Sequence, residues 1–196
     1  MVSSRLRGFS NEIVNPIAEV IVKFGIGPNT ITFLGLFFSI ATAYMYTENN
    51  LIFAFYMLLL ASIFDLMDGA VARVSNNITK FGGVFDSITD RYSDAIILLG
   101  LAIYLDSHFI LILIVLVGTL LVSYTRTRAE HEIEKCAVGF AERAERLIIL
   151  LIATLLEALN IFPKFDLFYI ALILLAVITH ITVLYRLIYT FNELTA

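Results

Sequence analysis

Four aspartates lie close together in this sequence, at the join of two long apolar segments. Residues 65–90 read DLMDGAVARVSNNITKFGGVFDSITD. Asp65 and Asp68 are three residues apart, so they share one face of a helix. Asp86 and Asp90, four apart, share a face of the next helix, and antiparallel helices that pack as neighbours would bring the two pairs together. Four carboxylates that converge in this way form an oxygen-only site for a hard cation, which suits Mg²⁺ or Mn²⁺.

The apolar segment before Asp65 makes the position of this acid costly. From Ile52 to Asp65 an α-helix would rise about 20 Å, which places the carboxylate inside the hydrocarbon depth of a membrane. An unpaired acid there costs roughly 2.5–3.5 kcal/mol, and four such costs are of order 10 kcal/mol, comparable with the stability of a domain. The cluster therefore needs a wet cavity and a cation. The alternative interpretations are pairing of one aspartate with Arg73 or Arg91, and a small-residue helix contact at Gly69.

The composition predicts an all-α integral membrane protein. The 196 residues are 60% hydrophobic and 15% charged, with a mean hydropathy of +0.91. A soluble domain of this length would need more polar surface, whereas about 20 apolar residues span a bilayer core of roughly 30 Å. We expect residues 1–196 to form one domain, with a six-helix transmembrane bundle in residues 28–196. The expected spans are Ile31–Tyr46, Ile52–Val71, Val84–Leu105, Phe109–Tyr124, Leu147–Ile161 and Leu167–Tyr189.

Residues 1–27 predict an amphipathic helix in the membrane interface. Apolar residues recur at helical spacing from Leu6 to Phe24, with charged residues such as Arg5 and Glu19 between them. A poorly ordered tail is the alternative. We expect no cleavable signal, because the opening residues lack the apolar stretch that such signals require.

Lysine and arginine are distributed unequally between the two sides of the expected bundle. With the N-terminus inside, the outer joins carry Lys164 alone. Basic residues favour the cytoplasmic side, so we expect both termini and the metal-containing cavity to face the cytoplasm, in a multi-pass protein of the plasma membrane. The basic residues of the inner joins are Arg5, Arg7, Lys23, Arg73, Lys80, Arg126, Arg128, Lys135, Arg143 and Arg146.

The aspartate segment resembles the signature of the CDP-alcohol phosphotransferase family, D-x2-D-G-x2-A-R-x8-G-x3-D-x3-D. The resemblance covers nearly the whole chain, because the six-helix layout and the N-terminal helix also agree with it. It implies an enzyme in which a CDP-linked donor meets an alcohol acceptor and CMP leaves. Every fixed position of the signature is matched: Asp65, Asp68, Gly69, Ala72, Arg73, Gly82, Asp86 and Asp90.

The resemblance also implies a role for each residue of the signature. Asp65, Asp68 and Asp86 would bind one divalent ion, Mg²⁺ or Mn²⁺, and Asp65, Asp86 and Asp90 would surround a second. Asp90 would also be the base that takes the proton of the acceptor hydroxyl. For the PNTIT segment, the start of a helix is the alternative interpretation. The residues implied to contact the CDP-lipid are Pro28, Asn29, Thr30, Ile31, Gly69, Arg73 and Thr79.

A second group of polar residues could bind an anion beside the metals. Arg186 lies in an otherwise cation-free helix, and an arginine inside a membrane is a functional candidate. A solvated loop explains Arg128, Lys135 and Arg143. The segments SYTRTRAE and GFAERAERL look like the inositol-phosphate branch of the same family, the phosphatidylinositol phosphate and archaetidylinositol phosphate synthases. Asp94 could receive inositol hydroxyls or pair with Arg91. The positions that hold the acceptor's phosphate in that branch correspond to Ser123, Arg126, Arg146 and Arg186.

Together these features predict a role in phospholipid biosynthesis. We expect transfer of the phosphatidyl or archaetidyl group from CDP-diacylglycerol or CDP-archaeol to 1L-myo-inositol 1-phosphate. Within the family, glycerol 3-phosphate as acceptor stays open, as does CDP-inositol as donor with di-myo-inositol phosphate as product. A membrane cation transporter is the alternative of another class, although the sequence lacks the repeat and the helix breaks that it would favour. The expected partners are the two substrates, membrane lipid and a second copy of the chain in a homodimer, with no nucleic acid.

Overall fold

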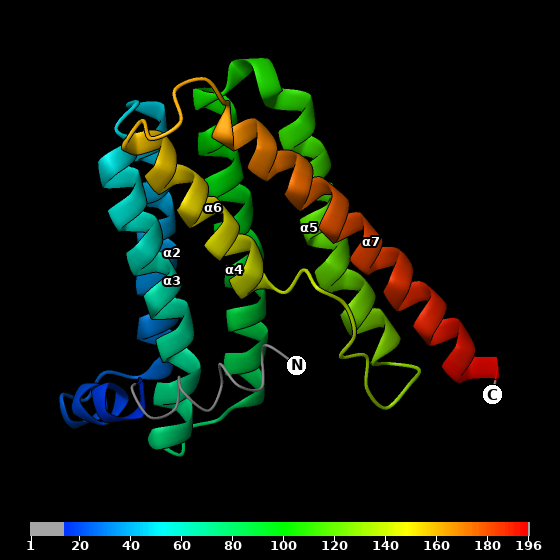
Figure 1. Cartoon of the computed structure of the whole chain (residues 1–196). Helices are drawn as coiled ribbons and strands as arrows, with labels where there is room; N and C mark the ends of the chain where they lie inside the picture. Colours follow the sequence, from blue (N-terminus) through cyan, green and yellow to red (C-terminus); the bar gives the residue numbers. More distant parts are fainter. Residues whose placement is uncertain (1–13, 196) are drawn as a thin grey trace.

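The protein is helical throughout the part of the chain that its structure describes. The computed structural model describes residues 14–195, and none of these forms a strand. Residues 14–23 are helical, as predicted for that part of the N-terminal segment, and this helix crosses one end of the bundle in Figure 1; residues 1–13 lie outside the described part. The other elements are α2 (Pro28–Thr47), α3 (Leu51–Val74), α4 (Lys80–Tyr104), η1 (Asp106–His108), α5 (Phe109–Ala129), α6 (Arg143–Ala158) and α7 (Leu167–Thr195).

Three of the helices are followed by an asparagine in a left-handed backbone conformation. Asn49, Asn76 and Asn160 have φ angles of 55°, 52° and 49°, each two residues beyond the end of α2, α3 or α6. The short polar side chain of asparagine tolerates this conformation better than most residues do. The chain therefore turns sharply after each of these helices.

The helices that carry the site begin at specific caps. The Thr79 hydroxyl accepts a hydrogen bond of 2.9 Å from the backbone N–H of Gly82 and so caps α4. A Cβ on Gly82 would lie 2.9 Å from the same hydroxyl oxygen, which accounts for glycine there. At α6, Glu142 and Glu145 form a capping box. Because this box starts α6 at Arg143, the polar segment 143–146 before the predicted span Leu147–Ile161 is helical too.

The six long helices contact one another in a ring. α2 packs against both α3 and α4, and the ring continues from α3 through α6, α7 and α5 back to α4. A Cβ on Gly100 would collide with the backbone of Ala43, so the α2–α4 contact is close. The expectation that the two aspartate-bearing helices pack directly as neighbours is wrong, because α2 lies against both while α3 and α4 make few contacts with each other. The aspartates thus face one another across a gap.

The two ends of the ring differ in polarity. One end, where α3 connects to α4 and α5 to α6, carries the aspartates and is called the site end here. Toward the other, the far end, an apolar core fills the ring with residues from all six helices, among them Leu58, Leu101 and Leu172. At this end the Tyr46 hydroxyl hydrogen-bonds Thr154 Oγ1 at 2.6 Å. The core closes the ring at the far end and leaves polar side chains at the site end.

Four segments are long and apolar enough to cross a membrane. They are Pro28–Thr47, Leu51–Val74, Asp106–Ala129 and Leu167–Thr195. Within the described residues, α4 and α6 do not meet this criterion, since α4 carries Asp86, Asp90, Arg91 and Asp94 and α6 has 16 residues. Many large apolar side chains, such as Phe33, Phe37 and Ile110, are exposed on the outer faces of the helices. An apolar exterior of this extent is typical of a protein in contact with lipid.

Candidate active site

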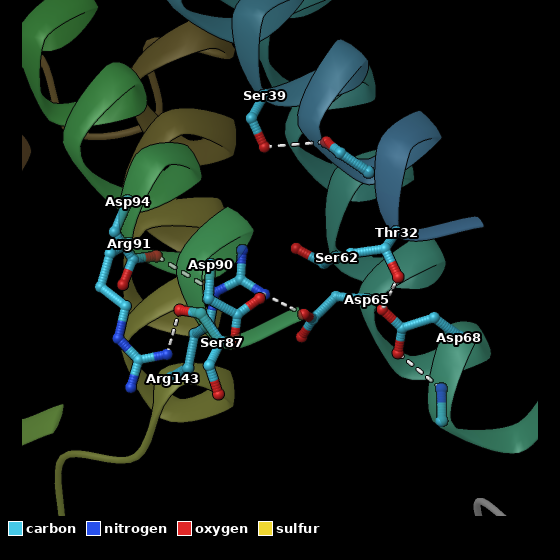
Figure 2. Close-up of polar contacts among 12 residues, drawn as sticks. Thr32, Ser39, Ser62, Asp65, Asp68, Ser87, Asp90, Arg91, Asp94 and Arg143 are labelled. Carbon is cyan, nitrogen blue, oxygen red and sulfur yellow. Dashed lines mark hydrogen bonds and ion pairs between the residues drawn. The ribbon is translucent and has the colours of Figure 1, made fainter. Parts of the chain in front are cut away.

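Three carboxylates converge at the site end of the bundle. Asp65 and Asp68 of α3 and Asp86 of α4 each have an oxygen within 4.8 Å of those of the other two. Figure 2 shows the α3 aspartates on one side of the gap and Asp90 and Asp94 of α4 on the other. Like charges this close repel one another unless a cation lies between them. A donor set made only of carboxylate oxygens fits a hard divalent ion such as Mg²⁺ or Mn²⁺.

Asp68 is oriented by hydrogen bonds to both of its oxygens. The Thr32 hydroxyl donates to Oδ2 at 2.9 Å, and the Gly69 backbone N–H donates to Oδ1 at 2.5 Å. Asp68 is 8% exposed, so these bonds are shielded from solvent. Partners of this kind set the direction in which a carboxylate presents its remaining lone pairs. Thr32 was not predicted as a site residue, although it directly follows the predicted Pro28–Ile31 segment.

Arg143 lies among the acids of the cluster. Its Nη1 forms an ion pair with Asp65, its distance to Asp90 Oδ1 is 2.6 Å, and its Nε lies 3.2 Å from Asp94 Oδ1. The explanation of Arg143 as a cation of a solvated loop is wrong, because the capped start of α6 directs the side chain into the ring and leaves it 17% exposed. Figure 2 shows its guanidinium between Asp65 and Asp90.

Asp94 pairs with two arginines of α6. Arg146 Nη2 lies 2.6 Å from Asp94 Oδ2, and Arg146 Nη1 donates to the carbonyl of Ala141 at 2.7 Å. Arg143 contacts the other oxygen of Asp94. The considered pairing of Asp94 with Arg91 is not found, because Arg91 donates instead to the carbonyl of Ser87, one turn earlier on its own helix. Asp94 thus joins the carboxylate cluster to a group of cations.

One cavity opens beside the motif, between α2, α3 and α4. It has a volume of about 340 Å³, and Asp68 and Asp86 line it. Ile31 lies in the apolar cluster with Met67 and Val71, and Thr30 is exposed outside the lining. We call this space the α3–α4 cavity. The residues of the predicted CDP-lipid set that line it are Pro28, Asn29, Gly69, Arg73 and Thr79.

A second cavity lies on the opposite side of the cluster, between α4, α5, α6 and α7. It has a volume of about 410 Å³, and Asp90 and Asp94 line it. All four residues predicted to bind the acceptor's phosphate, Ser123, Arg126, Arg146 and Arg186, lie in its wall. We call this space the α4–α7 cavity. Five arginines line it: Arg91, Arg126, Arg143, Arg146 and Arg186.

The arginines contributed by α5 and α7 have partners within the protein. Arg186 is 2% exposed; its Nε donates to the carbonyl of Val138 at 2.8 Å and its Nη1 to the carbonyl of Val122. Arg126 forms an ion pair of 3.1 Å with Glu130 on the same helix. Within residues 14–195 Arg186 forms no ion pair, so its carbonyl partners leave its positive charge unbalanced. The α4–α7 cavity therefore has the charge and the planar donors that suit a phosphate.

Comparison with known proteins assigns the family. A family model described as CDP-alcohol phosphatidyltransferase matches residues 26–188, so the chain belongs to that family. The prediction drawn from the aspartate signature is confirmed. The chain is accordingly a transferase rather than the cation transporter considered as an alternative.

The similar proteins include synthases of inositol phospholipids. Archaetidylinositol phosphate synthase of Pyrococcus horikoshii is 36% identical over 159 residues, which cover 81% of this chain and 85% of the relative. The synthase of the same name from Methanothermobacter thermautotrophicus is 36% identical over 191 residues, 97% of this chain and 95% of the relative. These matches span most of each protein.

A solved structure has the same fold. The crystal structure of phosphatidylinositol phosphate synthase of Mycobacterium tuberculosis with CDP-DAG bound aligns with a TM-score of 0.78 at 33% identity, over 92% of this chain and 94% of that chain. The same synthase in complex with manganese and citrate aligns with a TM-score of 0.79 at 33% identity, over 91% of this chain and 89% of that chain.

Proposed function

We propose that this protein transfers the lipid-phosphoryl group of a CDP-lipid, CDP-archaeol or CDP-diacylglycerol, to 1L-myo-inositol 1-phosphate and releases CMP. The observation that carries the proposal is the position of the carboxylate cluster between two cavities. Asp68 and Asp86 line the α3–α4 cavity, whereas Asp90 and Asp94 line the arginine-rich α4–α7 cavity. A donor bound on one side and an anionic acceptor on the other would meet at the carboxylates. The inositol phospholipid synthases among the relatives support this acceptor.

The α3–α4 cavity is proposed to bind the CDP group of the donor. Gly69, in its wall, permits a close approach of the nucleotide to the helix backbone, because it has no Cβ. Arg73 offers a planar pair of donors for a phosphate. Pro28, Asn29 and Thr79 complete this part of the wall, while Thr30 and Ile31 of the predicted set contribute through the helix start that they form. A solved relative with CDP-DAG bound supports the assignment.

The carboxylates are proposed to hold two divalent ions. Asp65, Asp68 and Asp86 form the set that fits one ion, and Asp65, Asp86 and Asp90 the set for a second. Divalent ions bound there supply the positive charge that neutralises a pyrophosphate and stabilises a departing phosphate group. The manganese complex of the M. tuberculosis synthase supports the choice of Mg²⁺ or Mn²⁺.

Asp90 is proposed to act as the base. Its carboxylate takes the proton of the acceptor hydroxyl while the hydroxyl oxygen forms a bond to the lipid-linked phosphorus. The bond between that phosphorus and the oxygen of CMP breaks, so the phosphorus changes partners and CMP leaves with the electron pair. Asp90 suits this role because it lines the acceptor-side cavity, where the acceptor hydroxyl would approach it.

The arginines of the α4–α7 cavity are proposed to hold the phosphate of the acceptor. A dianion beside four carboxylates needs cations of its own, or the acids would repel it. Arg126, Arg146 and Arg186, with Ser123, supply charge and hydrogen-bond donors in the wall of this cavity. Charge-assisted bonds from arginine to phosphate are strong and often bidentate. This requirement distinguishes inositol phosphate from free inositol as a substrate.

We also propose that all six long helices span the plasma membrane, with the site end and the C-terminus in the cytoplasm. The polar residues of α4 face the cavities, and α6 completes the ring of helices. These two observations support α4 and α6 as membrane spans, although hydropathy does not identify them. The connections at the site end carry Arg73, Lys80, Arg126, Arg128 and Lys135, while Lys164 lies at the far end. If the C-terminus is cytoplasmic, a fluorescent reporter fused to it should be active in cells, and a reporter that is active only in the periplasm should be inactive.

We also expect the protein to form a homodimer. Chemical cross-linking in native membranes tests this expectation.

The activity is tested with purified protein, Mn²⁺ and radiolabelled inositol 1-phosphate. CDP-archaeol and CDP-diacylglycerol are supplied in separate reactions, and label in the lipid extract together with free CMP measures transfer. We expect product with at least one donor, and about 10²–10⁴-fold slower formation with the Asp90→Asn variant as a matched control. Free inositol, serine and glycerol 3-phosphate serve as competing acceptors. If any of these is used as well as inositol phosphate, the proposed acceptor is wrong.

A further inference from the structure

The proposed reaction assigns no step to Arg143, although its guanidinium lies inside the carboxylate cluster. The side chain contacts Asp65, Asp90 and Asp94 at once and is 17% exposed. Its position on α6, 78 residues from Asp65 along the chain, depends on the capping box that starts the helix. A buried cation held by three acids balances charge that would otherwise destabilise the fold.

The guanidinium and a divalent ion would bind the same carboxylates. Arg143 pairs with Asp65 Oδ1 and with Asp90 Oδ1, and these two residues belong to the set proposed for the second ion. Arginine stays protonated in proteins, so it cannot relieve the conflict by losing its charge. Two cations that compete for the same carboxylates repel each other across a few ångströms. Binding of one cation therefore weakens the hold of these carboxylates on the other.

Arg143 also has a contact on the side of the acceptor. Its Nε lies 3.2 Å from Asp94 Oδ1, and the other oxygen of Asp94 is held by Arg146 at 2.6 Å. Arg143 and Asp94 both line the α4–α7 cavity. A side chain that releases Asp65 and Asp90 can thus keep its contact with Asp94 and place its charge over that cavity.

We propose that Arg143 is a tethered counter-cation that exchanges with a divalent ion. Without the ion, it occupies Asp65 and Asp90 and stabilises the cluster. When the ion binds, Arg143 gives up these carboxylates, remains attached through Asp94 and adds its charge to the acceptor side. The inference rests on the proposed second ion site, and Arg143 acts in it as a positioning residue. Ion binding and acceptor binding would then favour each other, as linkage requires.

The test is Mn²⁺ binding to the full-length protein, measured by electron paramagnetic resonance without lipid or inositol phosphate. We expect Arg143→Gln to bind Mn²⁺ about tenfold more tightly than wild type, within the range of about 5- to 150-fold that is typical of coupled sites. The matched control is Arg128→Gln, because Arg128 pairs with Glu132 on the exposed surface and its loss should leave Mn²⁺ affinity unchanged. A purely structural role for Arg143 predicts weaker binding instead. Unchanged or weaker binding in Arg143→Gln overturns the inference.

A second variant covers the case in which Arg143→Gln does not fold without metal. Arg143→Lys keeps the charge but has no planar fork to span several carboxylates, so it should fold and bind Mn²⁺ more tightly than wild type. Affinity equal to wild type in this variant also overturns the inference. The titration involves neither substrate, so its failure is distinct from a failure of the proposed activity, which the product assay reports.

Discussion

Polar groups have opposite arrangements at the two ends of the bundle. At the far end they pair with each other, as Tyr46 does with Thr154 and Asp166 does with His108, both at 2.6 Å. At the site end, the carboxylates of Asp65, Asp68 and Asp86 come within 4.8 Å of one another. At the site end acids thus lie against one another as well as against Thr32, Arg143 and Arg146, while at the far end each of the two pairs joins one donor with one acceptor.

We infer that this difference separates groups that stabilise the fold from groups that serve a ligand. A satisfied hydrogen bond contributes modestly to stability and needs no further partner. Arg143 balances only part of the charge of the carboxylates, so the cluster still costs stability until a ligand neutralises it, and such locally unfavourable arrangements are expected at functional sites. Mutations at the site end should therefore change ligand binding and turnover, and mutations at the far end should change stability alone.

The largest effects are expected from the two aspartates with different proposed roles. Asp65→Asn should lose both CDP-lipid binding and turnover, with kcat lower by about 10²–10³-fold or more, because its charge is shared by both ions. Asp90→Asn should lower kcat by about 10²–10⁴-fold yet retain CDP-lipid binding, since Asp65, Asp68 and Asp86 remain. Turnover and equilibrium binding of the CDP-lipid measure the two effects. Equal loss of donor binding in both variants contradicts the assignment of Asp90 chiefly as the base.

The next largest effect should be on the KM for the acceptor alone. Removal of one partner of a buried charge pair costs about 2–5 kcal/mol, or roughly 30-fold to several thousandfold. Arg146→Ala and Arg186→Ala should raise the KM for inositol phosphate by this factor and leave the KM for the CDP-lipid nearly unchanged. Arg128→Ala is the surface control. If both Michaelis constants rise together, the two arginines have a structural role through the carbonyls that they hold.

Stability should respond with opposite signs at the two ends. In metal-free protein, Asp86→Asn removes one of the clustered charges and should raise stability by about 0.5–2 kcal/mol. Tyr46→Phe should lower it by about 0.5–1.5 kcal/mol, while Thr154 still donates to the carbonyl of Leu150 at 2.7 Å. Thermal unfolding in detergent, with and without Mn²⁺, measures both. A loss of stability in metal-free Asp86→Asn would show that the cluster is not a source of strain.

The smallest effect concerns acid stability at the far end. Burial raises the pKa of Asp166, but the hydrogen bonds from His108 and from the Tyr169 N–H outweigh it and hold this pKa below its ordinary value of 3.8. A lowered pKa means that the stabilisation is present above the ordinary value and is lost as the pH falls through the lowered one. The pair is partly exposed, so its contribution is about 0.2–1 kcal/mol. Asp166→Asn should flatten the decrease in melting temperature below about pH 4 without any effect on turnover at neutral pH; an unchanged acid profile contradicts this.

The sequence by itself determined the family, the helical class and the acids of the site. Spacings of three and four residues place side chains on one face of a helix wherever that helix packs, so the pairing of Asp65 with Asp68 needs no tertiary information. The apolar lengths likewise predicted all six helices. The two helices that hydropathy does not identify as spans are α4, whose acids lower its hydropathy, and α6, which is short.

The tertiary structure decided which groups surround those acids. Thr32 reaches Asp68 across 36 residues and Arg143 reaches Asp65 across 78, and no local pattern encodes contacts at such separations. The gap between α3 and α4 arises because α2 packs against both helices, which a sequence-based expectation of neighbouring helices does not foresee. Arg143 and Arg128 are both arginines near the same polar segment, yet the capped start of α6 directs Arg143 into the ring, while Arg128, on α5, lies at the surface and pairs with Glu132. The direction of a side chain depends on where its helix begins and on which helices it meets, and both are properties of the packed bundle.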